Sequence, residues 1–173
     1  MTIKYSNNSD ANKWLKDYNK DYPIVINDKK YKTLEHYLQC RIYYYSCTKN
    51  EKEIYENIME LECNDDYYDF LNTVNSMYVK KLSIDYNMLY CDYLQCRIFK
   101  VLQYPHLLTD LLNCDEDFQE VIQCENIDSL DTEELYKFKK SLMHINCYII
   151  NGHKKDPWNV IKDMFKEGRI SVG

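Results

Sequence analysis

Hydrophobic residues recur at helical spacing through most of the chain. The longest stripe runs from Tyr86 to Gln103, where apolar or aromatic side chains return every three or four residues until Pro105. A second stripe runs from Leu34 to Tyr45 and follows Thr33, a residue type that caps helices. Shorter patterns predict further helices at residues 51–62, 67–79, 106–113 and 133–150. The chain is therefore predicted to be mainly helical.

Two shorter signals mark a hairpin and a final helix. The stretch from Pro23 to Tyr31 has β-branched residues before the turn-forming "NDKKY", which predicts a small β-hairpin. Near the end of the chain, Asp156 is placed to cap a helix that has Pro157 at its first position and Gly168 as its stop.

The remaining segments are less regular. Residues up to Asp21 are expected to be irregular apart from a short helix near Trp14, and residues 115–126 fit either a short helix or the start of a strand. Because no segment has the composition of a linker, we expect residues 1–173 to form one domain. The predicted fold class is mainly α (α+β), a single compact helical domain with a small N-terminal β-hairpin.

The hexapeptide "YLQCRI" occurs twice, at 37–42 and at 93–98. On helices, Arg41 and Arg97 then lie on or beside an apolar face. Each can sit at the rim of a core helix with its charge reaching water, or line a cavity that receives a phosphate or carboxylate. Glu35 stands two residues before the first copy and Cys91 before the second, so the copies differ in chemistry. By its position alone, Glu35 is an ordinary first-turn carboxylate that the helix dipole favours.

Composition limits the classes of function. The 173 residues are 45% hydrophobic and 29% charged, which is typical of a globular domain, and the net charge of −6 argues against extended nucleic-acid binding. Three glycines leave no room for a glycine-rich phosphate loop. No secretory signal or membrane-length apolar run is found, so the eight cysteines are interpreted as reduced thiols of a cytoplasmic protein. The isolated His36/Cys40 pair does not predict a metal site.

The segment "VINDKKYKTLEHYLQCRI" resembles the NADAR (YbiA-like) family. Its hallmark is a short hairpin followed by "Y-x-[ST]-x-EHY-x-Q", matched here from Tyr31 to Gln39. "YSN" at Tyr5 to Asn7 is similar to the family's opening "SNF", and "KVLQYPHL" from Lys100 is similar to its "K-F-x-Q-N/H-P-x-L". The resemblance covers nearly the whole chain and implies a YbiA-like fold.

The resemblance also implies an activity, which is hydrolysis of an N-glycosidic bond in a phosphorylated ribosyl or ADP-ribosyl small molecule, without a cofactor. Glu35 would be the catalytic carboxylate, and Asp128 in "ENID" would assist it. Breaking the bond builds positive charge on the ribose, which a carboxylate stabilises, and a carboxylate also orients the attacking water. The substrate contacts implied by the resemblance are Asn7, His36, Tyr37, Arg41, Tyr86 and Arg97.

Departures from the family's pattern keep an alternative open. The family's Trp before the second long helix is missing, with Tyr86 the nearest candidate, as is the "WG" after the acidic segment. The Gly-rich loop before the last helix is reduced to "NGHKKDPW". These losses favour a catalytically degenerate relative that acts as a binding or interaction module. An unrelated helical protein is the third reading.

Overall fold

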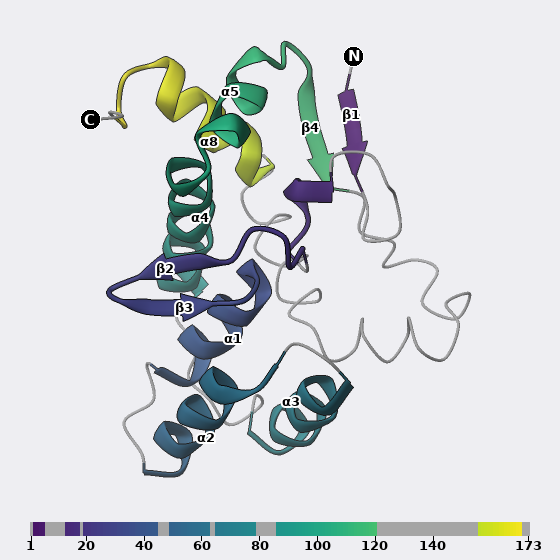
Figure 1. Ribbon diagram of the computed structural model, residues 1–173, viewed down its shortest axis with the longest axis vertical. Helices are drawn as coiled ribbons and strands as arrows, with labels where there is room; N and C mark the ends of the chain where they lie inside the picture. The colour runs from purple at the N-terminus through teal and green to yellow at the C-terminus, as the bar shows by residue number, and fades with distance from the viewer. Residues whose placement is uncertain are drawn as a thin grey trace.

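We describe the protein from a computed structural model, which is mainly helical with a small antiparallel hairpin (Figure 1). The structure describes residues 2–5, 13–17, 19–44, 49–62, 65–78, 86–120 and 156–170. The helices among these residues are α1 (Leu34–Tyr44), α2 (Lys49–Glu60), α3 (Asp65–Tyr78), α4 (Tyr86–Gln103), α5 (Pro105–Asn113), α8 (Pro157–Lys166) and the 3₁₀ turn η1 (Lys13–Leu15). The strands are β1 (Thr2–Tyr5), β2 (Ile24–Ile26), β3 (Lys29–Tyr31) and β4 (Asp117–Glu120). The predicted mainly helical (α+β) class with a small hairpin is confirmed.

Helix α4 contacts α1, α5, α8 and β2 (Figure 1). Its bounds are those that the hydrophobic stripe predicted, and Pro105 begins α5 directly after it. Tyr93, Cys96 and Val101 are fully buried along its length. The predicted helices at 51–62, 67–79 and 106–113 are confirmed as α2, α3 and α5, whereas the one at 133–150 lies outside the described residues.

The first two turns of helix α1 are buried on all sides. Every side chain from Thr33 to Cys40 is buried, although the sequence predicted a single apolar stripe. The difference arises because α2 packs on one side of α1 and α4 on another (Figure 1). As predicted, Thr33 caps the helix, since its Oγ1 accepts a hydrogen bond from the backbone N–H of His36 at 2.9 Å.

Strands β2 and β3 form the predicted hairpin, with Ile24 opposite Tyr31. Its two-residue turn is Asn27–Asp28, with φ values of 52° and 63°, and Asn and Asp tolerate this left-handed conformation. The outer edge of β2 is closed by a side chain. Gln103 accepts a hydrogen bond from the Val25 backbone N–H at 2.9 Å and donates one to its carbonyl at 2.7 Å.

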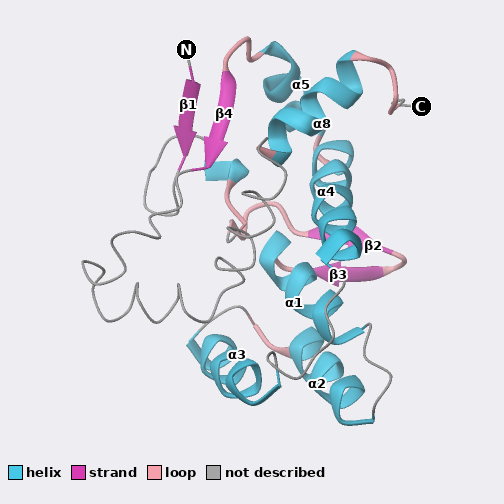
Figure 2. Ribbon diagram, turned by 180° about the vertical axis from the view of Figure 1, so that it is seen from behind, coloured by secondary structure: helices cyan, strands magenta, loops and turns pink. Residues whose placement is uncertain are grey.

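A second, parallel strand pair corrects the expectation of an irregular N-terminus. Strand β1 pairs with β4 from Thr2 opposite Asp117 to Tyr5 opposite Glu120 (Figure 2). Residues 115–126 were expected to form either a short helix or the start of a strand, and β4 shows that a strand begins at Asp117. The expected short helix near Trp14 is confirmed as η1. Four residues of "TIKY" carry little period-two signal, and strands with distant partners are hard to find from local pattern.

The last helix, α8, is confirmed with its signals. Asp156 accepts a hydrogen bond from the Trp158 backbone N–H at 2.9 Å, Pro157 opens the helix, and Gly168 follows it at φ +70°. Trp158 is fully buried. Among the described helices, none combines the length and apolar character needed to cross a membrane.

Candidate functional site

The side chain of Glu35 is buried in the first turn of α1. It is 2% exposed, more completely buried than an ordinary first-turn carboxylate. Its backbone N–H donates to the carbonyl of Asp17 at 3.0 Å. Gln39 follows one turn later and is 0% exposed, so that the two polar side chains share one face of a core helix. Buried polar groups of this kind cost free energy unless they are partnered, and the helix N-terminus favours a negative charge.

Asp17 also forms a buried ion pair with Arg97 of α4. An Arg97 terminal nitrogen lies 2.8 Å from Asp17 Oδ1 and donates to the hydroxyl of Tyr93 at 2.5 Å. The guanidinium lies 3.7 Å from the centre of the Tyr93 ring and 5.1 Å from that of Trp158. Arg97 is 0% exposed. The expectation of an arginine at the rim of the core is therefore wrong for Arg97, which is instead an internal counterion.

Lys100, one turn further along α4, is a second buried cation. Its Nζ donates to the carbonyl of Trp14 at 2.5 Å and lies 5.6 Å from the centre of the Tyr22 ring. Burial lowers the pKa of Lys100 to about 8, and the nearby carboxylate of Asp17 opposes that shift. Three ionisable groups, Asp17, Arg97 and Lys100, thus lie together in the core.

The arginine of the first hexapeptide has a different setting. Arg41 Nε lies 3.3 Å from Asp92 Oδ2, and the side chain of Arg41 remains 22% exposed. Its guanidinium lies 5.9 Å from the centre of the Tyr37 ring. Because Arg41 follows Glu35 by six residues, the two lie about 120° apart around α1. The structure therefore does not place Arg41 and Glu35 on the same face of the helix.

His36 and Tyr37 belong to the core. The backbone N–H of Lys32 donates to His36 Nδ1 at 3.1 Å, and His36 Nε2 donates to the carbonyl of Ile58 at 2.7 Å. Burial lowers the pKa of His36, which fits a neutral ring that joins α1 to α2. Tyr37 is 2% exposed and packs edge-on against Tyr31 at 4.9 Å. These contacts account for both residues without a substrate.

The remaining predicted site residues lie partly or wholly outside the described part of the chain. Asn7 and Asp128 are not among the described residues, and Tyr86 begins α4 with its side chain outside the description. Convergence of Glu35 with Asp128 thus stays a prediction. Glu35 and Arg97 are joined through Asp17, whereas Arg41 pairs elsewhere.

Sequence reasoning missed four residues of this region: Asp17, Gln39, Lys100 and Trp158. Gln39 and Lys100 stand within the motifs quoted for the family resemblance, so their place in these motifs could have identified them. Asp17 lies in a polar stretch without periodicity, and its partner Arg97 is 80 residues away. No local pattern predicts such a pair.

The donor set of the described residues does not suggest a metal centre, since no three His, Cys, Asp or Glu side chains among them lie close enough to hold one ion. The described site therefore consists of the buried carboxylate of Glu35 and, next to it, the Asp17–Arg97 ion pair, in a core of low dielectric constant.

No protein-family model, curated protein or solved structure matches the chain.

Proposed function

We propose that the protein hydrolyses an N-glycosidic bond of a ribosyl-phosphate or ADP-ribosyl substrate, with Glu35 as the catalytic carboxylate. The observation that carries the proposal is the burial of Glu35, at 2% exposure, on a core helix. Glutamate side chains are seldom buried this deeply, so the position is unusual for a first-turn carboxylate and marks it as a candidate functional group. The "EHY" context of Glu35, which resembles the NADAR family, supports the same role.

The reaction requires one water. The water oxygen bonds to C1′ while the C1′–N bond breaks, and the leaving nitrogen keeps the bonding electrons and takes up a proton. Glu35 stabilises the positive charge that develops on the ribose and accepts a proton from the attacking water. By resemblance, Asp128 assists Glu35, and Asn7 and Tyr86 contact the substrate. Arg41 is the arginine we expect to hold a phosphate, because part of its side chain is exposed.

A specific observation favours a second candidate, a non-catalytic binding module. Both hexapeptide arginines already face carboxylates, Arg41 that of Asp92 and Arg97 that of Asp17. A phosphate must compete with a carboxylate at Arg41, and that competition weakens a substrate contact. Under this reading the protein binds an ADP-ribosyl group or a protein partner and does not hydrolyse an N-glycosidic bond.

Hydrolysis by the purified full-length chain tests the first proposal. The substrates are a phosphorylated ribosylamino-pyrimidine and an ADP-ribosylated nucleobase, and chromatography measures the released base. Glu35→Gln preserves the shape of the side chain and removes its charge, so we expect kcat to fall about 100-fold or more. Glu56→Gln, an exposed carboxylate on α2, is the matched control and should retain wild-type kcat.

The two candidates give different results. Hydrolysis that depends on Glu35 supports the enzyme. If wild type releases no base from either substrate, yet binds ADP-ribose by calorimetry with equal affinity in wild type and Glu35→Gln, the binding module is correct and the enzyme proposal is wrong. Circular dichroism and thermal melting establish that each variant is folded.

A further inference from the structure

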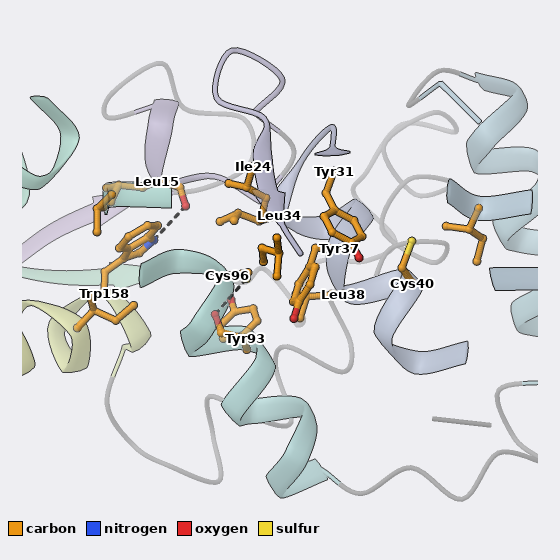
Figure 3. Packing of buried hydrophobic residues seen from close by; sticks show 14 of the residues in the cluster. Leu15, Ile24, Tyr31, Leu34, Tyr37, Leu38, Cys40, Tyr93, Cys96 and Trp158 are labelled. Carbon is orange, nitrogen blue, oxygen red and sulfur yellow. Dashed lines mark hydrogen bonds between the residues drawn. The ribbon is translucent and has the colours of Figure 1, made fainter. Parts of the chain in front are cut away.

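The segment Lys13–Asp17, called here the 13–17 segment, is held to the core through its backbone. Lys100 of α4 donates to the carbonyl of Trp14 at 2.5 Å. Trp158 of α8 donates from its indole Nε1 to the carbonyl of Leu15 at 3.1 Å, which Figure 3 draws as a dashed line. The rings of Trp14 and Trp158 also pack edge-on at 5.1 Å. Two helices thus fix consecutive carbonyls of this short segment.

Asp17 ends the segment and makes contacts in two directions. Its carboxylate accepts a hydrogen bond from Arg97 at 2.8 Å and one from the hydroxyl of Tyr93 at 3.4 Å. Its backbone carbonyl accepts the N–H of Glu35 at 3.0 Å. Asp17 therefore links Arg97 of α4 to the first turn of α1, because its carboxylate binds Arg97 and its backbone carbonyl binds Glu35.

The bond to Glu35 has a definite structural effect. The first N–H groups of a helix have no partner within the helix, and whatever binds them fixes where the helix begins. Thr33 takes the N–H of His36, and Asp17 takes that of Glu35. The position of the Glu35 backbone is set by the 13–17 segment, which Arg97 holds in turn.

From this geometry we propose that Asp17 is the positioning residue for Glu35, and that Arg97 serves to hold Asp17 and not a substrate phosphate. This inference rests on the proposed function only for its kinetic consequence. A catalytic carboxylate displaced by about 1 Å loses about 100-fold in rate. Weakening the Asp17–Arg97 pair should therefore lower kcat without a contact between Asp17 and the substrate.

The test is Asp17→Asn, which preserves the shape of the side chain and the backbone carbonyl while removing the charge that attracts Arg97. We expect kcat to fall about 10- to 100-fold with little change in KM, because Glu35 is displaced while substrate contacts remain. In the Glu35→Gln background, Asp17→Asn should cause no further loss of kcat, because the two changes act on one group. Amide hydrogen exchange at Glu35 should rise at least about tenfold in Asp17→Asn.

Two further variants guard against a simple loss of folding. Lys162→Met is the matched control, since Lys162 is a buried cation of α8 whose ammonium group contacts the Cys114 and Glu116 carbonyls and not the 13–17 segment. It should lower the melting temperature while leaving kcat and exchange at Glu35 unchanged. Tyr93→Phe removes only the hydroxyl that bonds Arg97 and Asp17, and should lower kcat several-fold, in the same direction as Asp17→Asn.

The outcomes separate this inference from the proposed function. Additive losses in the double variant, or exchange at Glu35 that Asp17→Asn and Tyr93→Phe leave unchanged, overturn the positioning role. If wild type is inactive, the proposed function has failed, and exchange at Glu35 still decides whether Asp17 sets its position. Should Asp17→Asn be unfolded, Tyr93→Phe supplies the same comparison.

Discussion

Single residues in this protein carry charge into the core. Arg97, Lys100 and Asp17 are each 5% exposed or less, and each has a partner of opposite charge, a carbonyl or an aromatic ring. Removing one member of a buried pair leaves an uncompensated charge, which costs about 3–5 kcal/mol. Of the two hexapeptide arginines, only Arg97 is fully buried, so removing the partner of Arg97 should cost more stability than removing the partner of Arg41.

The pKa of Lys100 gives a prediction about stability and pH. In the folded protein the pKa is about 8, below the ordinary value of 10.5. The unfolded chain therefore binds more protons between these values, and the free energy of unfolding rises with pH through this window. The cost of burying charged Lys100 is complete below about pH 8 and is gone near pH 10.5. We expect wild type to gain stability relative to Lys100→Met on going from pH 7 to pH 10, by roughly 2–3 kcal/mol.

Urea unfolding of both proteins at several pH values measures this difference. Comparison with Lys100→Met cancels the titration of other groups, such as Cys96, whose pKa burial raises to about 12. A difference between the two proteins that stays constant from pH 7 to pH 10 would show that Lys100 titrates normally in the folded state.

At the scale of elements, two amide side chains act as strand partners. Gln103 of α4 binds both backbone groups of Val25 in β2. Asn159 of α8 does the same for Phe118 in β4, with both hydrogen bonds at 2.7 Å. Each amide presents one donor and one acceptor, as a neighbouring strand would. Helices thereby hold strands that are too short to be stable alone.

This arrangement predicts reciprocal effects of two substitutions. Asn159→Ala removes both hydrogen bonds to Phe118, so we expect at least about tenfold faster amide exchange there and about 1–3 kcal/mol lower stability. Exchange at Val25 should not change. Gln103→Ala should do the reverse, accelerating Val25 and not Phe118. Exchange measured by NMR on both variants checks this, and equal acceleration at both sites would indicate global destabilisation in place of local release.

At the scale of the whole molecule, α4 joins several elements of the described part of the chain, because it contacts α1, α5, α8 and β2. Cys91 and Cys96 lie on this helix only five residues apart, with Cys91 exposed and Cys96 0% exposed. Cys96 can therefore meet a reagent only when the core opens, whereas Cys91 is accessible in the folded state.

We expect N-ethylmaleimide to modify Cys91 at least about a thousandfold faster than Cys96 at pH 8, since opening the core costs several kcal/mol. Tandem mass spectrometry of the labelled protein over time distinguishes the two positions. The rate at Cys96 should rise with urea as steeply as global unfolding does. Comparable native-state rates at both cysteines would mean that α4 does not move with the core as one unit.

Much of this protein was determined by local sequence. The 3.6-residue stripe of α4, the Thr33 and Asp156 caps, the "ND" turn and Gly168 act through nearest neighbours along the chain. These signals were sufficient for the described α-helices, the hairpin and the mainly helical class. The β1–β4 pair was missed because its strands are more than 100 residues apart.

The candidate site was predictable only in part. The sequence singled out Glu35 through its motif, but the depth of its burial depends on α2, α4 and the 13–17 segment packing around α1. Periodicity predicts that an arginine lies beside an apolar face. It does not predict whether a carboxylate from a distant part of the chain packs against that arginine. The pairing of Arg97 with Asp17 and of Arg41 with Asp92 is known only from the folded structure. Sequence alone fixes short-range backbone preference, whereas the state of a buried charge depends on distant partners that tertiary packing brings within hydrogen-bonding distance.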